Sequence, residues 1–151
     1  MIAAAAIVPA FFAWAAIHEL SHALCARLWQ DAHSFRFRLY PHRKGRRFLW
    51  ASVTYNIVAV AEEWQLAAKK LAPRLPDVCA AIALPWCAGA PLWVSVLVGG
   101  GVVDLAVGSI GRSERSDLWT ASWLMGINPW WLRAGGFAVA LASVGCWAWG
   151  L

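Results

Sequence analysis

Charged residues are scarce in this chain. Asp, Glu, Lys and Arg make up only 14% of its 151 residues, while 61% of the residues are hydrophobic. A soluble globular domain carries about 25% charged and about 45–50% apolar residues. The shortage of charge argues against an ordinary soluble domain. It favours a membrane protein that forms a single domain over residues 1–151.

Paired cysteines are also missing. The four cysteines, Cys25, Cys79, Cys87 and Cys146, stand apart in apolar surroundings, with no CxxC spacing between them. Such spacing marks zinc ribbons and redox motifs, and a regular set of cysteines marks small disulfide-stapled domains. The sequence excludes both classes. We expect the cysteines to act as small buried hydrophobic residues.

No basic residue precedes the first apolar run. Residues 2–17 are sixteen apolar positions, and the run continues to Ala26 before Arg27 ends it. A secretory signal peptide has a basic start and a shorter apolar core. A helix over residues 2–26 would be about 37 Å long, enough to cross a bilayer with some tilt. We therefore expect a retained transmembrane helix.

Positive charge is grouped rather than spread, although the formal net charge is only +5. Residues 27–47 carry seven Lys and Arg residues against one acidic residue, Asp31. Beside apolar spans, such a block indicates a cytoplasmic loop that follows the positive-inside rule. We therefore expect a lipid bilayer as a partner and no nucleic acid.

The loop itself has the pattern of a β-hairpin. Apolar and polar residues alternate over 34–40, a turn is expected over 41–45, and β-branched and aromatic residues resume over 48–55. Helical periodicity follows over 59–71, where Glu62, Glu63, Lys69 and Lys70 form a polar side. This second segment is expected to lie on the membrane surface.

The remaining chain is long enough for three more crossings. Residues 76–111 exceed one span, Gly89 and Pro91 interrupt them, and basic residues flank both ends. An even number of crossings follows from those flanks. The first of the two would be short or would begin within the preceding helix. A Trp-rich interfacial segment over 112–133 and a last span over 134–151 complete the chain. The predicted fold is mainly α and integral to the membrane. It has about four transmembrane helices, a short cytoplasmic β-hairpin between the first two, and both termini outside.

The first span contains the sequence His18-Glu19-Leu20-Ser21-His22, which is an HExxH motif. Residues at i and i+4 share one face of a helix, so both histidines can bind one metal ion. Glu19 lies beside them, where it can take a proton from water. Ionisable groups inside a span are costly and therefore mark function. We predict a zinc site with Glu19 as the general base.

A third ligand is required because catalytic zinc normally takes three ligands from the protein. Asp104 lies eight residues before Arg112, and His18 lies nine residues before Arg27. If both spans run inward, the two side chains have similar depth. Gly100 and Gly108 flank Asp104 on its own helix face and would allow close helix approach. Asp104 is therefore the expected third ligand.

Other candidates remain. They are His33, His42, Glu62, Glu63 and Asp117. Glu62 and Glu63 are the main rivals, because some HExxH proteins take a glutamate from a later helix, but charge patterning favours a solvated face for them. His33 and His42 fit the loop and the turn. No histidine follows His42, which excludes a glutamic intramembrane protease that needs histidines on later helices.

The motif HELSH on a first apolar helix, the later Asp104 on a glycine-rich helix and the hairpin between them resemble the site-2 protease superfamily of membrane zinc metalloproteases. The small bacterial members are the most similar. The resemblance implies Zn²⁺ on His18, His22 and Asp104, with Glu19 as the base. We therefore expect a membrane zinc metalloprotease that cleaves membrane or membrane-proximal substrates near the cytoplasmic face of the bacterial inner membrane.

Two alternatives stay open at this stage. The hairpin either adds a strand to an extended substrate or braces the membrane surface with its Arg and aromatic residues. The chain is either a protease or a non-proteolytic metal-binding membrane scaffold that regulates one. A structural zinc site has no need of a base such as Glu19, and this favours the protease.

Overall fold

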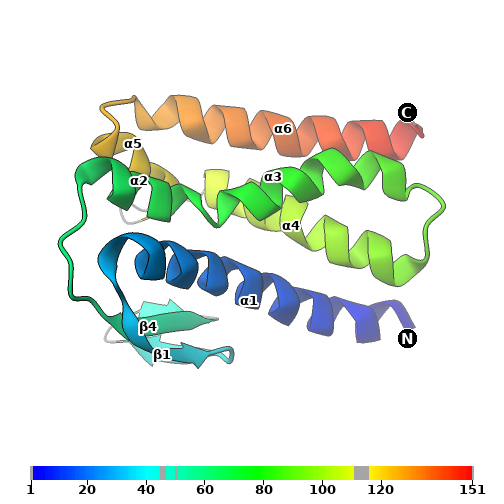
Figure 1. The fold of residues 1–151 in the computed structure, drawn as a ribbon. Helices are drawn as coiled ribbons and strands as arrows, with labels where there is room; N and C mark the ends of the chain where they lie inside the picture. Colours follow the sequence, from blue (N-terminus) through cyan, green and yellow to red (C-terminus); the bar gives the residue numbers. More distant parts are fainter. Residues whose placement is uncertain (1, 45–46, 50, 111–115, 151) are drawn as a thin grey trace.

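Helices that alternate in direction form an elongated bundle with a β-hairpin at one end (Figure 1). The computed structural model describes residues 2–44, 47–49, 51–110 and 116–150. The elements are α1 (Ile2–Gln30), β1 (His33–Arg38), β2 (His42–Lys44), β3 (Arg47–Leu49), β4 (Ser52–Asn56), α2 (Glu63–Leu71), α3 (Arg74–Ala83), the 3-10 helix η1 (Leu84–Cys87), α4 (Leu92–Ile110), α5 (Asp117–Leu124) and α6 (Pro129–Trp149).

Among the described residues, three helices are long and apolar enough to cross a membrane, namely Ile7–Gln30 of α1, Leu92–Ile110 and Pro129–Trp149. The expected count of four long spans is wrong, because the segment that returns the chain between α2 and α4 is divided into α3, with ten residues, and η1, with four. Ala72 and Pro73 keep helical dihedrals between α2 and α3, although proline cannot continue the hydrogen-bond ladder. The short segment therefore begins directly after the preceding helix.

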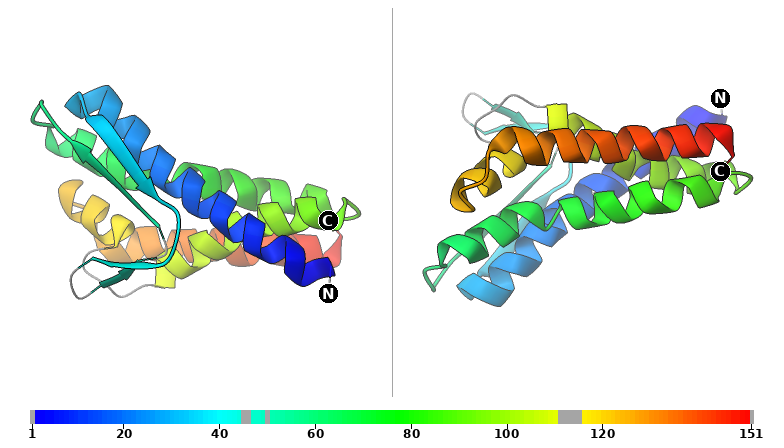
Figure 2. Two further views of the ribbon diagram at one scale, coloured as in Figure 1. Left: turned by 90° about the horizontal axis from the view of Figure 1, so that it is seen from below. Right: turned by 90° about the horizontal axis from the view of Figure 1, so that it is seen from above.

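Both ends of the chain lie at one end of the bundle, and the hairpin and α5 lie at the other (Figures 1 and 2). The chain turns back at residues 88–91, where Gly89 has a φ of +86°, a backbone conformation that glycine adopts readily. The expected reversal near Gly89 and Pro91 is confirmed. Residues 111–115, which include Arg112 and Arg115, lie outside the described residues.

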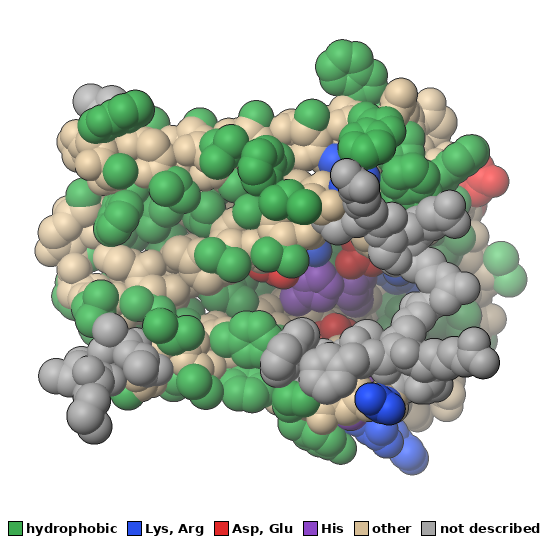
Figure 3. Space-filling view, turned by 180° about the vertical axis from the view of Figure 1, so that it is seen from behind, with side chains coloured by type: hydrophobic (Ala, Val, Ile, Leu, Met, Phe, Trp, Pro, Cys, Tyr) green, Lys and Arg blue, Asp and Glu red, His purple; other side chains and the backbone are tan. Residues whose placement is uncertain are grey.

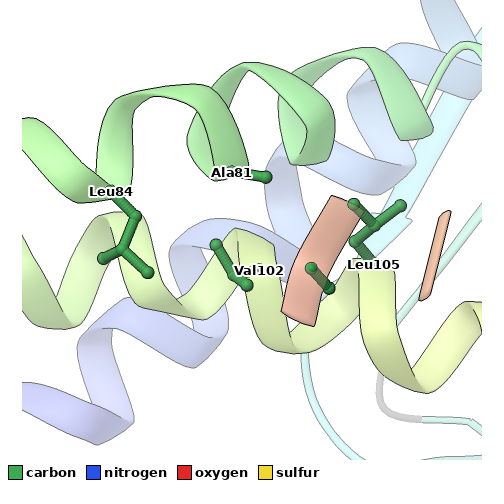
Figure 4. Close-up of a cluster of buried hydrophobic side chains, with 5 residues drawn as sticks. Ala81, Leu84, Val102 and Leu105 are labelled. Carbon is green, nitrogen blue, oxygen red and sulfur yellow. The ribbon is translucent and has the colours of Figure 1, made fainter. Parts of the chain in front are cut away.

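The central helix is α4, which packs against α1, α3 and α6. A cluster of buried side chains joins three of these helices, with Ala81, Leu84, Val102 and Leu105 drawn in Figure 4 and Ala140 contributed by α6. Small and medium side chains let the helices approach closely. The cluster fixes α4 against α3 and α6, and α1 packs directly against α4.

Arg133 of α6 forms hydrogen bonds with the C-terminal end of α4. Its Nε donates to the carbonyl oxygen of Ser109 at 2.8 Å, and its Nη2 donates to that of Ile110 at 2.7 Å. The last carbonyls of a helix lack partners within the helix, and a cation there also suits the helix dipole. The buried guanidinium therefore caps α4.

The outside of the bundle is apolar. Leu20, Leu24 and Leu28 form one exposed face of α1, and Val103 and Val107 are exposed on α4. Hydrophobic side chains cover much of the face shown in Figure 3. Soluble monomers rarely expose apolar patches of this extent. The surface is suited to apolar surroundings.

The expected hairpin is present and is longer than predicted. Strand β1 pairs antiparallel with β4, and β2 pairs antiparallel with β3. The rings of Phe35 and Phe37 stack 6.5 Å apart on one face, as the alternation predicts. The turn expected over 41–45 is wrong, because His42 to Lys44 form a strand. Pro41 has no N–H and interrupts the ladder only locally. Gly45 lies outside the described residues.

Two helix boundaries differ from expectation. Helix α2 begins at Glu63 rather than near residue 59, and the backbone N–H of Glu62 donates to Gln65 Oε1 at 2.9 Å. Helix α6 begins at Pro129, five residues before the expected 134. Its start is set by Asn128, whose side chain accepts from the N–H of Trp130 at 3.0 Å. Proline at the first helical position is favourable.

Candidate metal centre

The two histidines of the HExxH motif lie on one face of α1, with ring centroids 5.1 Å apart. Both face the side chain of Asp117. His18 Nε2 lies 3.4 Å from Asp117 Oδ2, and His22 Nε2 lies 3.2 Å from the same oxygen. Among the described residues, these three form a group whose ligand atoms all lie within 4.8 Å of one another. Figure 3 shows histidine and acidic side chains together in a recess of the bundle.

Helix α5 brings Asp117 to the histidines by packing against α2 and α6. Ser116 starts this helix, and its hydroxyl accepts from the N–H of Trp119 at 3.3 Å. Lys70 Nζ lies 3.1 Å from Asp117 Oδ1. Burial acts to raise the pKa of the Asp117 carboxyl, but hydrogen bonds from His18 and His22 and the Lys70 charge outweigh burial and hold this pKa well below its usual range. Asp117 is therefore an ionised carboxylate that could bind a metal ion.

The partners of the His22 ring determine which of its two nitrogens carries a proton. Its Nδ1 lies 2.9 Å from the carbonyl oxygen of Lys69, which can only accept, so Nδ1 carries the proton. A neutral imidazole has a single N–H. With Nδ1 carrying that proton, Nε2 can donate to Asp117 only if the ring carries a second proton. A metal ion between Nε2 and the carboxylate would take the place of that second proton.

His18, like His22, has an acceptor oxygen beside its Nδ1 atom. Its Nδ1 lies 3.3 Å from Asp104 Oδ2, on the opposite side of the ring from Asp117. Asp104 thus lies beside the HExxH helix, as the sequence predicts. It faces Nδ1 of His18, whereas Asp117 faces the Nε2 atoms of both histidines.

Arg74 holds Asp104 in place. Its Nη1 donates to Asp104 Oδ2 and to the Asp104 carbonyl oxygen, each at 3.1 Å. The same nitrogen donates to Asp77 Oδ2 at 2.7 Å, and Asp77 is 1% exposed. A Cβ at Gly108 would lie 2.8 Å from the guanidinium carbon. The absence of a side chain at Gly108 thus makes room for Arg74 beside Asp104.

In the same way, the absence of a side chain at Gly100 makes room for Trp14. A Cβ there would collide with the indole ring, which also donates from Nε1 to the Leu97 carbonyl oxygen. Trp14 lies one turn before His18 on α1. The close approach expected of Gly100 and Gly108 is therefore made by neighbouring side chains rather than by helix backbones.

Glu19 lies between the helices and the hairpin. Its Oε2 accepts from the backbone N–H of Val53 in β4 at 2.8 Å. Glu19 lines a cavity of about 620 Å³ between α1 and α4, together with His18 and Asp104. It also lines a second cavity of about 360 Å³ together with His22, Lys69 and Lys70. The Glu19 side chain thus borders a cavity on each of two sides.

The donor set fits a zinc ion. In a tetrahedral site with bonds of about 2.0–2.1 Å, two ligand atoms lie about 3.3–3.4 Å apart. The separations of 3.4 and 3.2 Å between the Nε2 atoms and Asp117 Oδ2 agree with this spacing. Two imidazoles and one carboxylate are a ligand set of catalytic zinc, which leaves one position open.

The rival candidates lie elsewhere. His42 donates from Nδ1 to the Tyr40 carbonyl oxygen at 2.8 Å, and its Nε2 lies 2.8 Å from Ser52 Oγ. Glu62 accepts from Trp64 Nε1 at 2.5 Å at the start of α2. Neither of them, nor Glu63 or His33, belongs to the metal group of the described residues.

No protein-family model, curated protein or solved structure matches this chain. Its function must therefore be argued from its own residues. The imidazoles of His18 and His22 and the carboxylate of Asp117 surround one point. The Nδ1 atom of each imidazole faces an acceptor, and a second carboxylate, Glu19, lies beside them.

Proposed function

We propose that this chain is a membrane-embedded zinc metallopeptidase with His18, His22 and Asp117 as its ligands. One observation carries the proposal. Both Nε2 atoms face one carboxylate oxygen, while both Nδ1 atoms face acceptors, Asp104 and the Lys69 carbonyl. Histidines that bind a metal almost always donate their other N–H to such an acceptor, which fixes the tautomer and the ring orientation.

The apolar exterior and the three long helices support the membrane setting. In this proposal the chain crosses the bacterial inner membrane several times. The hairpin and α5 face the cytoplasm, because basic residues gather in the hairpin, and the termini lie outside. The metal centre would then lie near the cytoplasmic surface. The substrates are membrane or membrane-proximal proteins.

Bound zinc would supply Lewis acidity, polarising a peptide carbonyl and lowering the pKa of water toward about 7. Glu19 would accept the proton that water loses and return it to the leaving amine. The Val53 N–H holds Oε2 of Glu19, so Oε1 remains available for the proton. Asp104 and the Lys69 carbonyl keep the imidazoles oriented.

The role of Asp104 separates two versions of this site. As the third ligand, Asp104 would have to turn away from Arg74 and from His18 Nδ1. As the acceptor for His18 Nδ1, it needs no movement. The proposal therefore assigns the metal to Asp117. Coordination by Asp104 remains the competing prediction.

Cleavage tests the proposed function. Zinc-loaded protein in detergent is mixed with a peptide that has an apolar segment next to a polar one, and the products are identified by mass spectrometry. The wild-type protein should cut, and Glu19→Gln should keep its zinc without cutting. Zinc binding with no cleavage of any membrane peptide would contradict peptidase function.

The hydrogen bond between Glu19 and Val53 favours a second candidate, a non-proteolytic metal-binding scaffold in which Glu19 only anchors the hairpin. Glutamine keeps an oxygen that can accept from Val53. An anchoring role therefore predicts no change in any activity on Glu19→Gln, whereas a general base predicts its loss.

A further inference from the structure

Glu19 lies between two cavities, one lined mainly by apolar side chains and the other mainly by polar and basic ones. The cavity of about 620 Å³ is bounded mainly by apolar side chains of α1 and α4, among them Phe11, Trp14 and Val103. The cavity of about 360 Å³ is lined by Glu19, His22, Val53, Thr54, Tyr55, Lys69 and Lys70. Glu19 is the residue that both share. A peptide bond beside Glu19 would therefore have an apolar surrounding on one side and a polar, basic one on the other.

The two lysines of the smaller cavity differ in their partners. Lys70 is paired with Asp117 at 3.1 Å. Lys69 Nζ donates to the neutral amide oxygen Gln30 Oε1 at 2.5 Å and lies 5.8 Å from the centre of the Tyr55 ring. No carboxylate of the described residues pairs with Lys69. A half-buried ammonium group with only neutral partners is favourable for an incoming negative charge.

The size of this cavity limits what it can take. Ligand pockets range over about 300–1,000 Å³, so 360 Å³ is at the small end. It suits one or two residues of an extended chain rather than an acyl chain. Strand β4 forms one wall and the last turn of α2 forms the other.

We propose that the smaller cavity binds a carboxylate of the peptide substrate, with Lys69 as its partner, on the far side of the scissile bond from the apolar segment. This rests on the proposed peptidase function and narrows its substrate class to apolar segments next to an acidic residue or a free C-terminus. Both sources present the same carboxylate, and the peptides of the test separate them.

Binding is measured first, with the Glu19→Gln protein so that no peptide is consumed. Labelled peptides carry one apolar segment followed by Asp, Asn or Lys, each with a free or an amidated C-terminus. Fluorescence anisotropy in zwitterionic micelles gives the affinities. A carboxylate in either position should tighten binding about tenfold or more, the worth of a charge-assisted hydrogen bond. The position that does so identifies the source.

Substitutions of Lys69 then test the partner. Lys69→Gln should remove the preference, and Lys69→Glu should reverse it toward the lysine peptide. Zinc content should stay unchanged in both variants, because the Lys69 carbonyl that holds His22 is part of the backbone. Arg38→Gln is the control. Arg38 is an exposed cation on β1 that lines neither cavity, and its loss should leave the preference intact.

Equal affinity for acidic and neutral peptides would overturn the inference, and so would a preference that survives Lys69→Glu. If micelles with phosphatidylglycerol abolish peptide binding in the wild-type pocket but not in Lys69→Gln, a lipid headgroup occupies the site, and the peptide assignment is wrong. The two proposals can fail separately. Cleavage without a charge preference would contradict only the proposed carboxylate site. A charge preference without cleavage would contradict only the proposed peptidase function.

Discussion

His18 Nδ1 lies 3.3 Å from Asp104 Oδ2, while Nε2 of the same ring lies 3.4 Å from Asp117 Oδ2. One imidazole is thus held between two carboxylates that come from different helices. Asp104 is fixed by Arg74, and Asp117 is shared with His22. The two carboxylates therefore have different tasks in this account, one orienting the ring and the other binding the metal.

Asp104→Asn should weaken zinc binding without abolishing it. Asparagine keeps an oxygen that accepts from His18 Nδ1 but loses the negative charge, and loss of such outer partners costs about 10–100-fold in metal affinity. Zinc titration with a competing chelator measures the affinity. Glu62→Ala and Glu63→Ala are the controls and should bind like wild type. Complete loss of zinc at saturating metal in Asp104→Asn would make Asp104 the ligand instead.

Glu19→Gln should retain one zinc per chain and lose turnover by roughly a hundredfold or more, the effect expected of a missing general base. The glutamine can still accept from the Val53 N–H, so the hairpin should stay in place. Steady-state cleavage together with elemental analysis measures both effects. A variant that cuts at the wild-type rate would exclude Glu19 as the base.

Gly108→Leu should disturb the metal site although no ligand is changed. A side chain there would meet the Arg74 guanidinium at 2.8 Å and push it away from Asp104. Zinc affinity should fall as in Asp104→Asn, and thermal stability should fall as well. Gly99→Leu is the matched control on the same helix, because a Cβ there meets nothing within 4 Å. Equal zinc affinity in the two variants would contradict this role of Arg74.

Cysteine labelling should place Arg43 and Arg115 on the cytoplasmic side, with reporter fusions at Met1 and Leu151 outside. The reason is that the hairpin and α5 share one end of the bundle and both chain ends share the other (Figure 1). Opposite placement of Arg43 and Arg115 would contradict a double crossing by residues 76–111.

Hydrophobic patterning was sufficient to predict most of the fold. It located α1, the hairpin, the reversal near Gly89 and the last helix. It overcounted the long spans because apolar composition does not reveal where helical hydrogen bonding stops. Pro73 and the 3-10 turn at Pro85 divide the returning segment into pieces too short to count.

Two of the three residues in the candidate metal site, His18 and His22, could be predicted from the sequence. His18 and His22 follow from helical spacing, and Asp104 from its depth relative to Arg112. Asp117 is one candidate in the sequence, but a comparison of depth applies only to residues within the apolar spans. Its place depends on α5 packing back against α2, a tertiary contact that no periodicity encodes.

Zinc content of purified wild-type and Asp117→Ala protein tests the central claim most directly. The chain is purified in detergent without chelators, incubated with zinc, desalted and analysed for metal. Wild type should hold about one zinc per chain, as expected for a catalytic site with three protein ligands and one open position. Asp117→Ala should hold almost none, like His18→Ala and His22→Ala. A wild-type protein that takes up no zinc, or an Asp117→Ala protein that keeps a full equivalent, would contradict the account.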